Sequence, residues 1–138
     1  MSPPAESLLD SIDRIRERDP RYRREAYLFV VGALALAVDR LPADRRADPE
    51  RRHLHGQEVL VAAIELARRE FGPLAATVFD EWGVTESRQL GEIVFQLVEA
   101  GQLSARDEDR IDDFAGGPEL RVALASPPAR ALRPSGGV

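Results

Sequence analysis

Several residue types are missing from this sequence of 138 residues: it has no cysteine, no lysine and no asparagine. Without cysteine there is no disulfide, no zinc site built from thiolates and no cysteine nucleophile. Arginine therefore supplies all 19 basic charges, against 24 acidic residues, and the net charge is −5. This balance excludes a strongly basic nucleic-acid coat and does not favour a polybasic membrane anchor.

The chain also lacks a long hydrophobic run. Its longest uncharged stretch spans only residues 26–38, whereas a helix needs about 20 apolar residues to cross a bilayer. Near the N-terminus, Glu6 and Asp10 stand where a signal peptide has a basic start and an apolar run. We therefore expect a cytoplasmic protein without a leader and without membrane association.

Apolar residues recur at helical spacing through most of the chain, which predicts a mainly α fold, a compact bundle of about five helices. Proline cannot continue a helix, and glycine readily adopts the left-handed conformation that follows one, so both mark helix ends. The predicted helices span Ser7–Asp19, Pro20–Leu41, Gly56–Phe71, Pro73–Trp82 and Thr85–Ala100. Asp19 and Thr85 are the predicted N-caps of the second and fifth helices, and Gly83 is the predicted end of the fourth.

The second of these helices has the strongest pattern. Its residues 26–38 are apolar on every side, and such a helix must be surrounded by its own domain or by a second subunit. Gly32 lies inside it, where glycine costs about 1 kcal/mol relative to alanine unless close packing compensates. We predict a central core helix, with a homodimer interface as the alternative.

The C-terminal part has a different pattern. Residues 104–114 are acidic, and Ile111 and Phe114 are expected to hold a short helical turn on the core. Apolar residues then alternate with others over residues 120–124, which indicates a strand. We expect one helical domain over residues 1–125 and a disordered tail over residues 126–138.

The last two helices and this strand suggest a winged helix-turn-helix, in which residues 103–106 and 120–124 form a small β-hairpin. The longer helix would then read DNA. Its water-facing side, however, carries the carboxylates of Glu92 and Glu99 beside a single guanidinium, that of Arg88, and carboxylates repel phosphate. The pattern therefore favours an acidic winged helix that contacts proteins.

The sequence contains no phosphate-binding glycine loop, no nucleophile elbow and no His-Glu-x-x-His motif. Its two histidines stand two residues apart with no evident third ligand, so we predict no metal, no cofactor and no catalytic residue. An enzyme would need a concave pocket lined by several polar or aromatic residues. The candidates for such a pocket are Tyr27, His53, His55, Gln57, Glu58 and Trp82.

Clustered arginines are the candidates for contact with an anion or a nucleic acid. Acidic residues such as Asp39, Asp44 and Asp48 lie between some of them, and a salt-bridged surface is the simplest interpretation. If folding separated the two signs of charge, these side chains could meet RNA. The candidate contacts are Arg21, Arg24, Arg45, Arg46, Arg51 and Arg52.

Several short sequence blocks, taken together, are specific enough to suggest a protein family. They include Asp19-Pro20-Arg21-Tyr22, His53-x-x-Gly56-Gln57-Glu58, Phe71-Gly72-Pro73-Leu74, Trp82-Gly83-Val84 and Gly91-Glu92-Ile93-Val94-Phe95. Over about residues 10–115 the chain resembles a family of small, conserved, uncharacterised bacterial proteins. The resemblance implies no activity, cofactor or catalytic residue. The family tends to have Ser or Thr at the position of His55 and Asn at the position of Gln96.

These observations predict a non-enzymatic protein–protein interaction or regulatory domain, a monomer or homodimer with an unknown protein partner. The alternative is a nucleic-acid-associated or ribosome-associated factor that uses the arginine-rich N-terminal half.

Overall fold

The computed structural model describes residues 6–116 and 119–125. Within these residues all regular structure is helical and there is no strand, so the predicted helical bundle is confirmed. The predicted disordered tail lies outside the described residues. The elements are α1 (Leu8–Arg18), α2 (Arg24–Asp39), α3 (Ala43–Ala47), α4 (Gly56–Phe71), η1 (Gly72–Leu74), α5 (Ala75–Trp82), α6 (Ser87–Glu99), η2 (Ile111–Phe114) and α7 (Leu120–Ala125).

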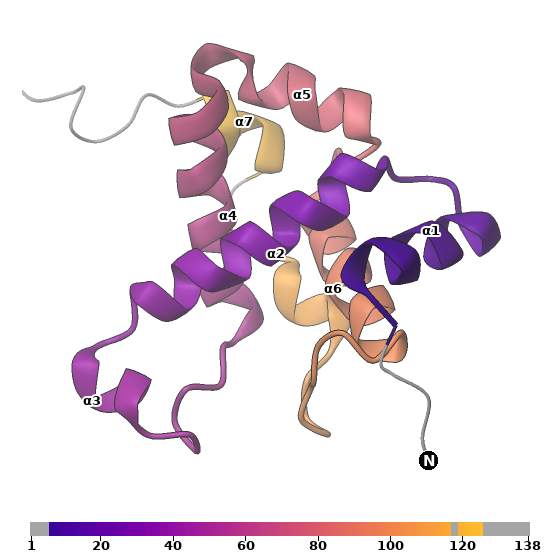
Figure 1. Ribbon diagram of the computed structural model, residues 1–138. Coiled ribbons are helices and arrows are strands. Elements are labelled where there is room, and N and C mark those ends of the chain that lie inside the picture. The colour runs from indigo at the N-terminus through magenta and orange to yellow at the C-terminus, as the bar shows by residue number, and fades with distance from the viewer. Residues whose placement is uncertain (1–5, 117–118, 126–138) are drawn as a thin grey trace, which may run out of the picture.

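Helix α2 is central to the packing, because it contacts α1, α4, α5 and α6. In Figure 1 it crosses in front of α4 and α6. Its inner side carries Ala26, Val30, Ala33 and Ala37, each at most 3% exposed. On this side α2 is the core helix that its apolar pattern predicts.

The start of α2 differs from the prediction, because the helix begins at Arg24 and not at Pro20. Asp19 is not its N-cap. The Asp19 carboxylate instead accepts a hydrogen bond from the backbone N–H of Arg21 at 3.3 Å, which forms a turn. An aspartate that bonds the backbone two residues later competes with the helix, and here the turn is the outcome.

Contacts with the end of α5 hold this turn in place. The N–H of Arg23 donates to the carbonyl oxygen of Trp82 at 3.1 Å. Gly83 follows with φ +88°, the left-handed conformation predicted for it. A Cβ at position 83 would lie 2.4 Å from the carbonyl oxygen of Arg21, so glycine is required for close approach as well as for backbone geometry.

Four aromatic side chains pack at the corner where α4 meets α5. Phe29 of α2 lies 5.3 Å from both Phe79 and Trp82 and 6.0 Å from Phe71, measured between ring centroids. These separations are those of favourable aromatic pairs. The corner therefore fixes Trp82 in the core packing.

The beginning of α6 lies slightly later than predicted. The N-cap is Glu86, one residue after Thr85, and the helix starts at Ser87. The side-chain oxygen of Gln89 accepts hydrogen bonds from the N–H groups of Thr85 at 2.7 Å and Glu86 at 3.0 Å. Gln89, the third residue of the helix, thus binds the N–H of the N-cap residue, as in a capping box.

The predicted anchor in the acidic segment is present as η2. Phe114 is 4% exposed, and its ring lies against Gly91 of α6. A Cβ at position 91 would come within 2.6 Å of that ring, so the absence of a side chain there admits Phe114 to the core. The element η2 covers one side of α6 and also contacts α4.

The predicted wing is wrong, because residues 120–125 form α7 and not a strand. Leu120 and Leu124 are both 3% exposed, whereas Val122 is 56% exposed. Spacing of four residues places two leucines on one side of a helix, and here they pack with α4 and α5. Alternating apolar residues are compatible with a strand and with a short helix. Packing against α4 and α5 selects the helix here.

The geometry also opposes a DNA-reading role for α6, which the charge of its water-facing side already disfavours. Besides η2 on one side, the loop before α2 covers another side of the helix. The hydroxyl of Tyr22 donates to Glu92 at 3.0 Å, and the Gln96 side chain donates to Asp19 at 2.8 Å. A helix that enters the major groove must present a free side, and α6 is packed between these two segments.

Candidate functional site

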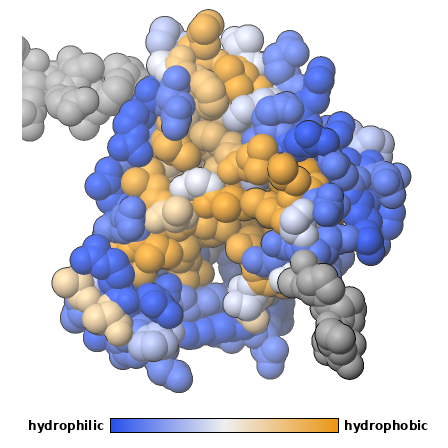
Figure 2. All heavy atoms as spheres, viewed as in Figure 1, coloured by the Kyte–Doolittle hydropathy of each residue, from blue (hydrophilic) through white to orange (hydrophobic). Residues whose placement is uncertain are grey.

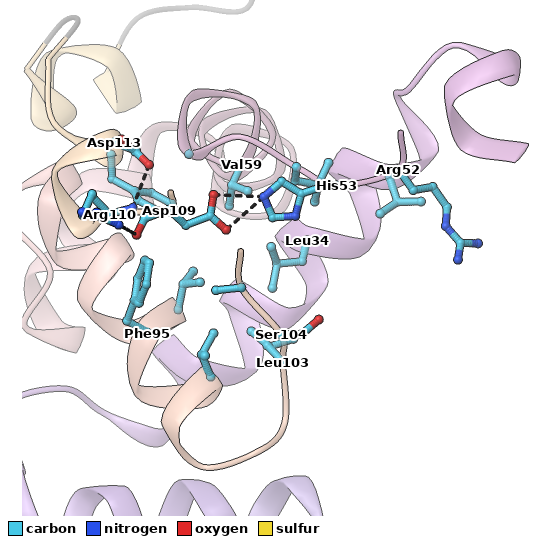
Figure 3. A pocket seen from close by; sticks show the side chains of 17 residues that line it. Leu34, Arg52, His53, Val59, Phe95, Leu103, Ser104, Asp109, Arg110 and Asp113 are labelled. Carbon is cyan, nitrogen blue, oxygen red and sulfur yellow. Dashed lines mark hydrogen bonds and ion pairs between the residues drawn. The ribbon is translucent and has the colours of Figure 1, made fainter. Parts of the chain in front are cut away.

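An apolar pocket of about 280 Å³ opens beside α2 (Figure 3). Its walls come from α2, the segment before α4, α6, and the loop that precedes η2. The apolar residues that line it include Leu34, Val38, Val94, Phe95, Val98 and Leu103. This volume is at the lower end for small-molecule sites, so the pocket fits a small apolar group such as one side chain of a partner.

A histidine–aspartate pair lies at the edge of this pocket. The Nε2 atom of His53 is 2.9 Å and 3.0 Å from the two carboxylate oxygens of Asp109, and both side chains are less than 20% exposed. Figure 3 shows the two groups facing each other. Burial raises the pKa of Asp109, but hydrogen bonds from the N–H of Arg106 and from His53 outweigh it and hold the pKa below its usual range.

The pair joins two segments that are 56 residues apart in the sequence. An ionised carboxylate orients the imidazole that it contacts. In Figure 3 the hydroxyl of Ser104 points away from the imidazole, and the remaining pocket walls are mostly apolar. The pair therefore holds the segment before α4 (residues 48–55) against the loop before η2.

The predicted pocket residues do not meet in one place. Tyr27 is fully buried and its hydroxyl donates to Gln96 at 2.6 Å; burial raises its pKa to about 12. Trp82 belongs to the aromatic corner. Gln57 donates to the carbonyl oxygens of Asp113 at 2.8 Å and Ala115 at 3.0 Å. Of the six candidates, only His53 lines the apolar pocket.

His55 and Glu58 serve the beginning of α4. His55 is the N-cap residue, and its N–H donates to the Glu58 carboxylate at 2.9 Å. This is the carboxylate half of a capping box. Glu58 also pairs with Arg45 at 2.7 Å, and this hydrogen bond holds the pKa of Glu58 below its usual range. The rings of His53 and His55 are 6.1 Å apart.

The candidate arginines form two separate groups. Arg21 and Arg24 lie at the beginning of α2, and the other four lie around α3, beyond the opposite end of that helix. A helix of this length separates its ends by about 24 Å. One anion therefore cannot contact both groups.

Most of these guanidinium groups already bind a carboxylate. Arg21 pairs with Asp19 at 2.8 Å and with Glu92 at 2.7 Å, and Arg24 pairs with Asp13 at 2.7 Å.

In the second group, Arg45 pairs with Glu58 and Arg51 with Asp44 at 3.2 Å, while Arg46 donates to the carbonyl oxygen of Asp39 at 3.3 Å. Arg52 makes no ion pair with any residue that the structure describes. A salt-bridged surface fits these contacts.

The outer side of α2 is a second candidate site. Leu28 is 39% exposed there, Gly32 and Ala35 are exposed, and Val31 and Leu36 are partly exposed. Figure 2 shows the apolar residues as a continuous band across the side of the molecule that α2 crosses. We call these five residues the α2 strip. The uncharged run in the sequence signals it, but only the packing shows which side remains uncovered.

Sequence reasoning missed most of the pocket. Asp109 belongs to an acidic run that looks solvated, and no spacing rule links it to His53 across 56 residues. The sequence pattern places Phe95 on the water-facing side of its helix and Leu103 in the predicted wing. No local signal could have identified these contacts, because they exist only once η2 has packed against α6.

In the described part of the chain, no three acidic or histidine side chains gather as a metal site would require. Among the same residues, no helix has the length and apolar character needed to cross a bilayer. Scans against protein-family models, curated proteins and solved structures find no significant match, so the family resemblance stays a prediction.

Proposed function

We propose that this chain is a protein-interaction domain and that the α2 strip is its binding surface. The observation that carries this proposal is the exposure of Leu28 together with Gly32 and Ala35 on one side of a helix whose other sides are packed. Isolated exposed apolar residues are ordinary, but a continuous apolar patch on a soluble domain marks a site of association.

The pocket enlarges this surface. Leu34 and Val38 of α2 line the pocket and follow the strip around the same helix. Apolar side chains at the pocket mouth are suited to receive an anchoring residue of a partner, which is how binding energy concentrates in protein interfaces. The strip and the pocket together offer a flat apolar surface with one depression beside it.

Ion pairing weighs against the nucleic-acid alternative. The guanidinium groups of Arg21, Arg24, Arg45 and Arg51 each bind a carboxylate of the same chain. A phosphate would have to compete with these carboxylates, and the excess of acidic residues opposes its approach. In the α2 strip the side chain of Leu66 lies beside Gly32, whereas Leu28 and Ala35 remain exposed.

The proposal is tested by capture from an extract of cells that express the protein natively. The tagged wild-type chain is compared with Leu28→Glu, which places a charge in the strip, and with Val122→Glu, which makes the same kind of change on α7. Capture is expected to fall at least about tenfold for Leu28→Glu, because a buried unpaired charge costs more than 1.4 kcal/mol. Equal capture by both variants would contradict the assignment of this surface.

A further inference from the structure

We propose that the apolar pocket receives a tyrosine side chain of the protein partner, with its ring between the apolar walls and its hydroxyl hydrogen-bonded to Nδ1 of His53. The inference rests on the proposed function, since it names the residue with which a partner on the same surface is anchored. It follows from the surroundings of this nitrogen, from the charges around the pocket and from the shape of its walls.

The two ring nitrogens of His53 have different surroundings. Nε2 lies within 3.0 Å of both carboxylate oxygens of Asp109. Nδ1 has no hydrogen-bond partner among the residues that the structure describes, and Figure 3 shows it on the side of the ring that faces Leu34. The side chain is only 18% exposed. A group that fills the pocket therefore removes Nδ1 from water and must replace the hydrogen bond that water provides.

A hydroxyl group suits this nitrogen in both protonation states of the ring. The Asp109 carboxylate accepts the proton of Nε2, so in the neutral ring Nδ1 carries a lone pair and accepts a hydrogen bond. In the protonated ring Nδ1 carries a proton and donates it. A hydroxyl can donate to the first form and accept from the second, whereas a carboxylate or an ammonium group matches only one of them.

The charged groups around the pocket favour an uncharged ligand. The guanidinium of Arg52 points away from the pocket (Figure 3). That of Arg110 donates to backbone carbonyl oxygens, among them that of Asp109 at 2.9 Å. The Asp113 carboxylate accepts from the N–H of Arg110 at 2.9 Å, and the Asp109 carboxylate is paired with His53. A charged ligand would therefore enter the apolar walls without an opposite charge to contact, which is costly.

The walls of the pocket suit an aromatic ring. Val38, Val98 and Leu103 supply aliphatic surface, and Phe95 supplies a ring, which forms favourable pairs with other rings. Serine and threonine also carry a hydroxyl, but their side chains are too short to fill a volume of about 280 Å³. Tyrosine combines a ring with a hydroxyl, and it is one of the residues that concentrate binding energy in protein interfaces.

Two soluble probes, N-acetyl-L-tyrosinamide and N-acetyl-L-phenylalaninamide, test the contact on the purified full chain. They differ only in the phenolic hydroxyl. Chemical-shift changes in heteronuclear NMR spectra measure each affinity and show which residues respond. We expect the tyrosine probe to bind at the pocket with a dissociation constant on the order of 1 mM. The phenylalanine probe should bind at least about fivefold more weakly, because it leaves Nδ1 without a hydrogen bond.

The variant His53→Phe removes Nδ1 and keeps a ring in the wall. Its preference for the tyrosine probe is expected to fall below about twofold. The matched control is His55→Phe, because the ring of His55 lies 6.1 Å from that of His53 and does not line the apolar pocket. This control should keep the preference of the wild type. Circular dichroism reports whether both variants are folded, and the comparison of the two probes on the wild type needs no variant.

Three results overturn the tyrosine anchor. They are equal affinities of the two probes for the wild type, shifts confined to residues outside the pocket, and a preference that His53→Phe retains. Absence of binding by the tyrosine probe up to about 20 mM, well above the expected dissociation constant, does the same.

The test also separates this inference from the proposed function. If the probes bind equally or not at all, the tyrosine anchor falls, and the comparison of Leu28→Glu with Val122→Glu still decides whether the α2 strip binds a partner. If the tyrosine probe is preferred but capture does not depend on Leu28, the strip falls as the binding surface, and a tyrosine of a partner on that surface falls with it.

Discussion

Positions without a side chain decide how closely the segments of this molecule approach one another. Gly83 ends α5 in the left-handed conformation and also lies against the carbonyl oxygen of Arg21. Gly101 has a similar φ of +81°, but nothing lies within 4 Å of its missing Cβ. The two glycines thus differ in surroundings while sharing a backbone conformation.

This difference predicts unequal costs for the same substitution. Gly101→Ala should lower the free energy of unfolding by about 1 kcal/mol, the cost of the left-handed conformation. Gly83→Ala should lower it by about 3 kcal/mol, because the backbone oxygen of Arg21 must also move. Urea denaturation of both variants checks the difference. Equal losses would show that the loop before α2 does not pack on Gly83.

At the scale of elements, the ion pair of His53 and Asp109 holds the segment before α4 against the loop before η2. The pKa of Asp109 lies below its ordinary value because hydrogen bonds to the carboxylate outweigh burial. The folded protein therefore releases this proton at a lower pH than the unfolded chain. The stability that Asp109 contributes is present above pH of about 4 and is lost as the pH falls through its folded pKa.

Asp109→Asn should therefore lower the free energy of unfolding by about 1–2 kcal/mol at neutral pH. The difference from the wild type should shrink below pH of about 4, where the wild-type carboxyl also becomes neutral. Asp107→Asn is the control, since that exposed side chain forms no ion pair in the described structure. Urea denaturation over a range of pH measures both variants, and a difference that does not depend on pH would contradict a role for the charge.

The C-terminal helix offers a second test at the same scale. Leu124→Ala should lower the free energy of unfolding by about 2–3 kcal/mol, because the side chain is buried between helices. Val122→Ala should change it by less than about 0.5 kcal/mol, since that residue is 56% exposed. Thermal unfolding checks both values. A strand with residues 120, 122 and 124 on one buried side would instead make both changes costly.

At the scale of the whole molecule, charge governs what the protein attracts. The net charge is −5, and ion pairs occupy several of the arginines that might meet a polyanion. Fluorescence anisotropy of labelled single-stranded RNA at low salt should therefore show no binding, whereas a polyarginine peptide in the same assay should bind. An affinity that falls steeply as salt rises would contradict this prediction.

Much of the fold was predictable because the relevant forces are local. Helical periodicity located α1, α4, α5 and α6 to within two residues, and Gly83 and Phe114 have the roles that their neighbours in sequence indicate. The start of α2 and the helical state of residues 120–125 were predicted wrongly. In both places the local pattern allows two structures, and a contact with α5 or α4 selects one.

The candidate site was less predictable for the same reason. The sequence alone determined that residues 26–38 form an apolar helix, because composition fixes that property in any packing. Only the tertiary structure decided that Leu28, Gly32 and Ala35 remain uncovered, that His53 meets Asp109, and that α6 has no free side. These are contacts between segments distant along the chain, and they depend on which side of each helix its neighbours happen to cover.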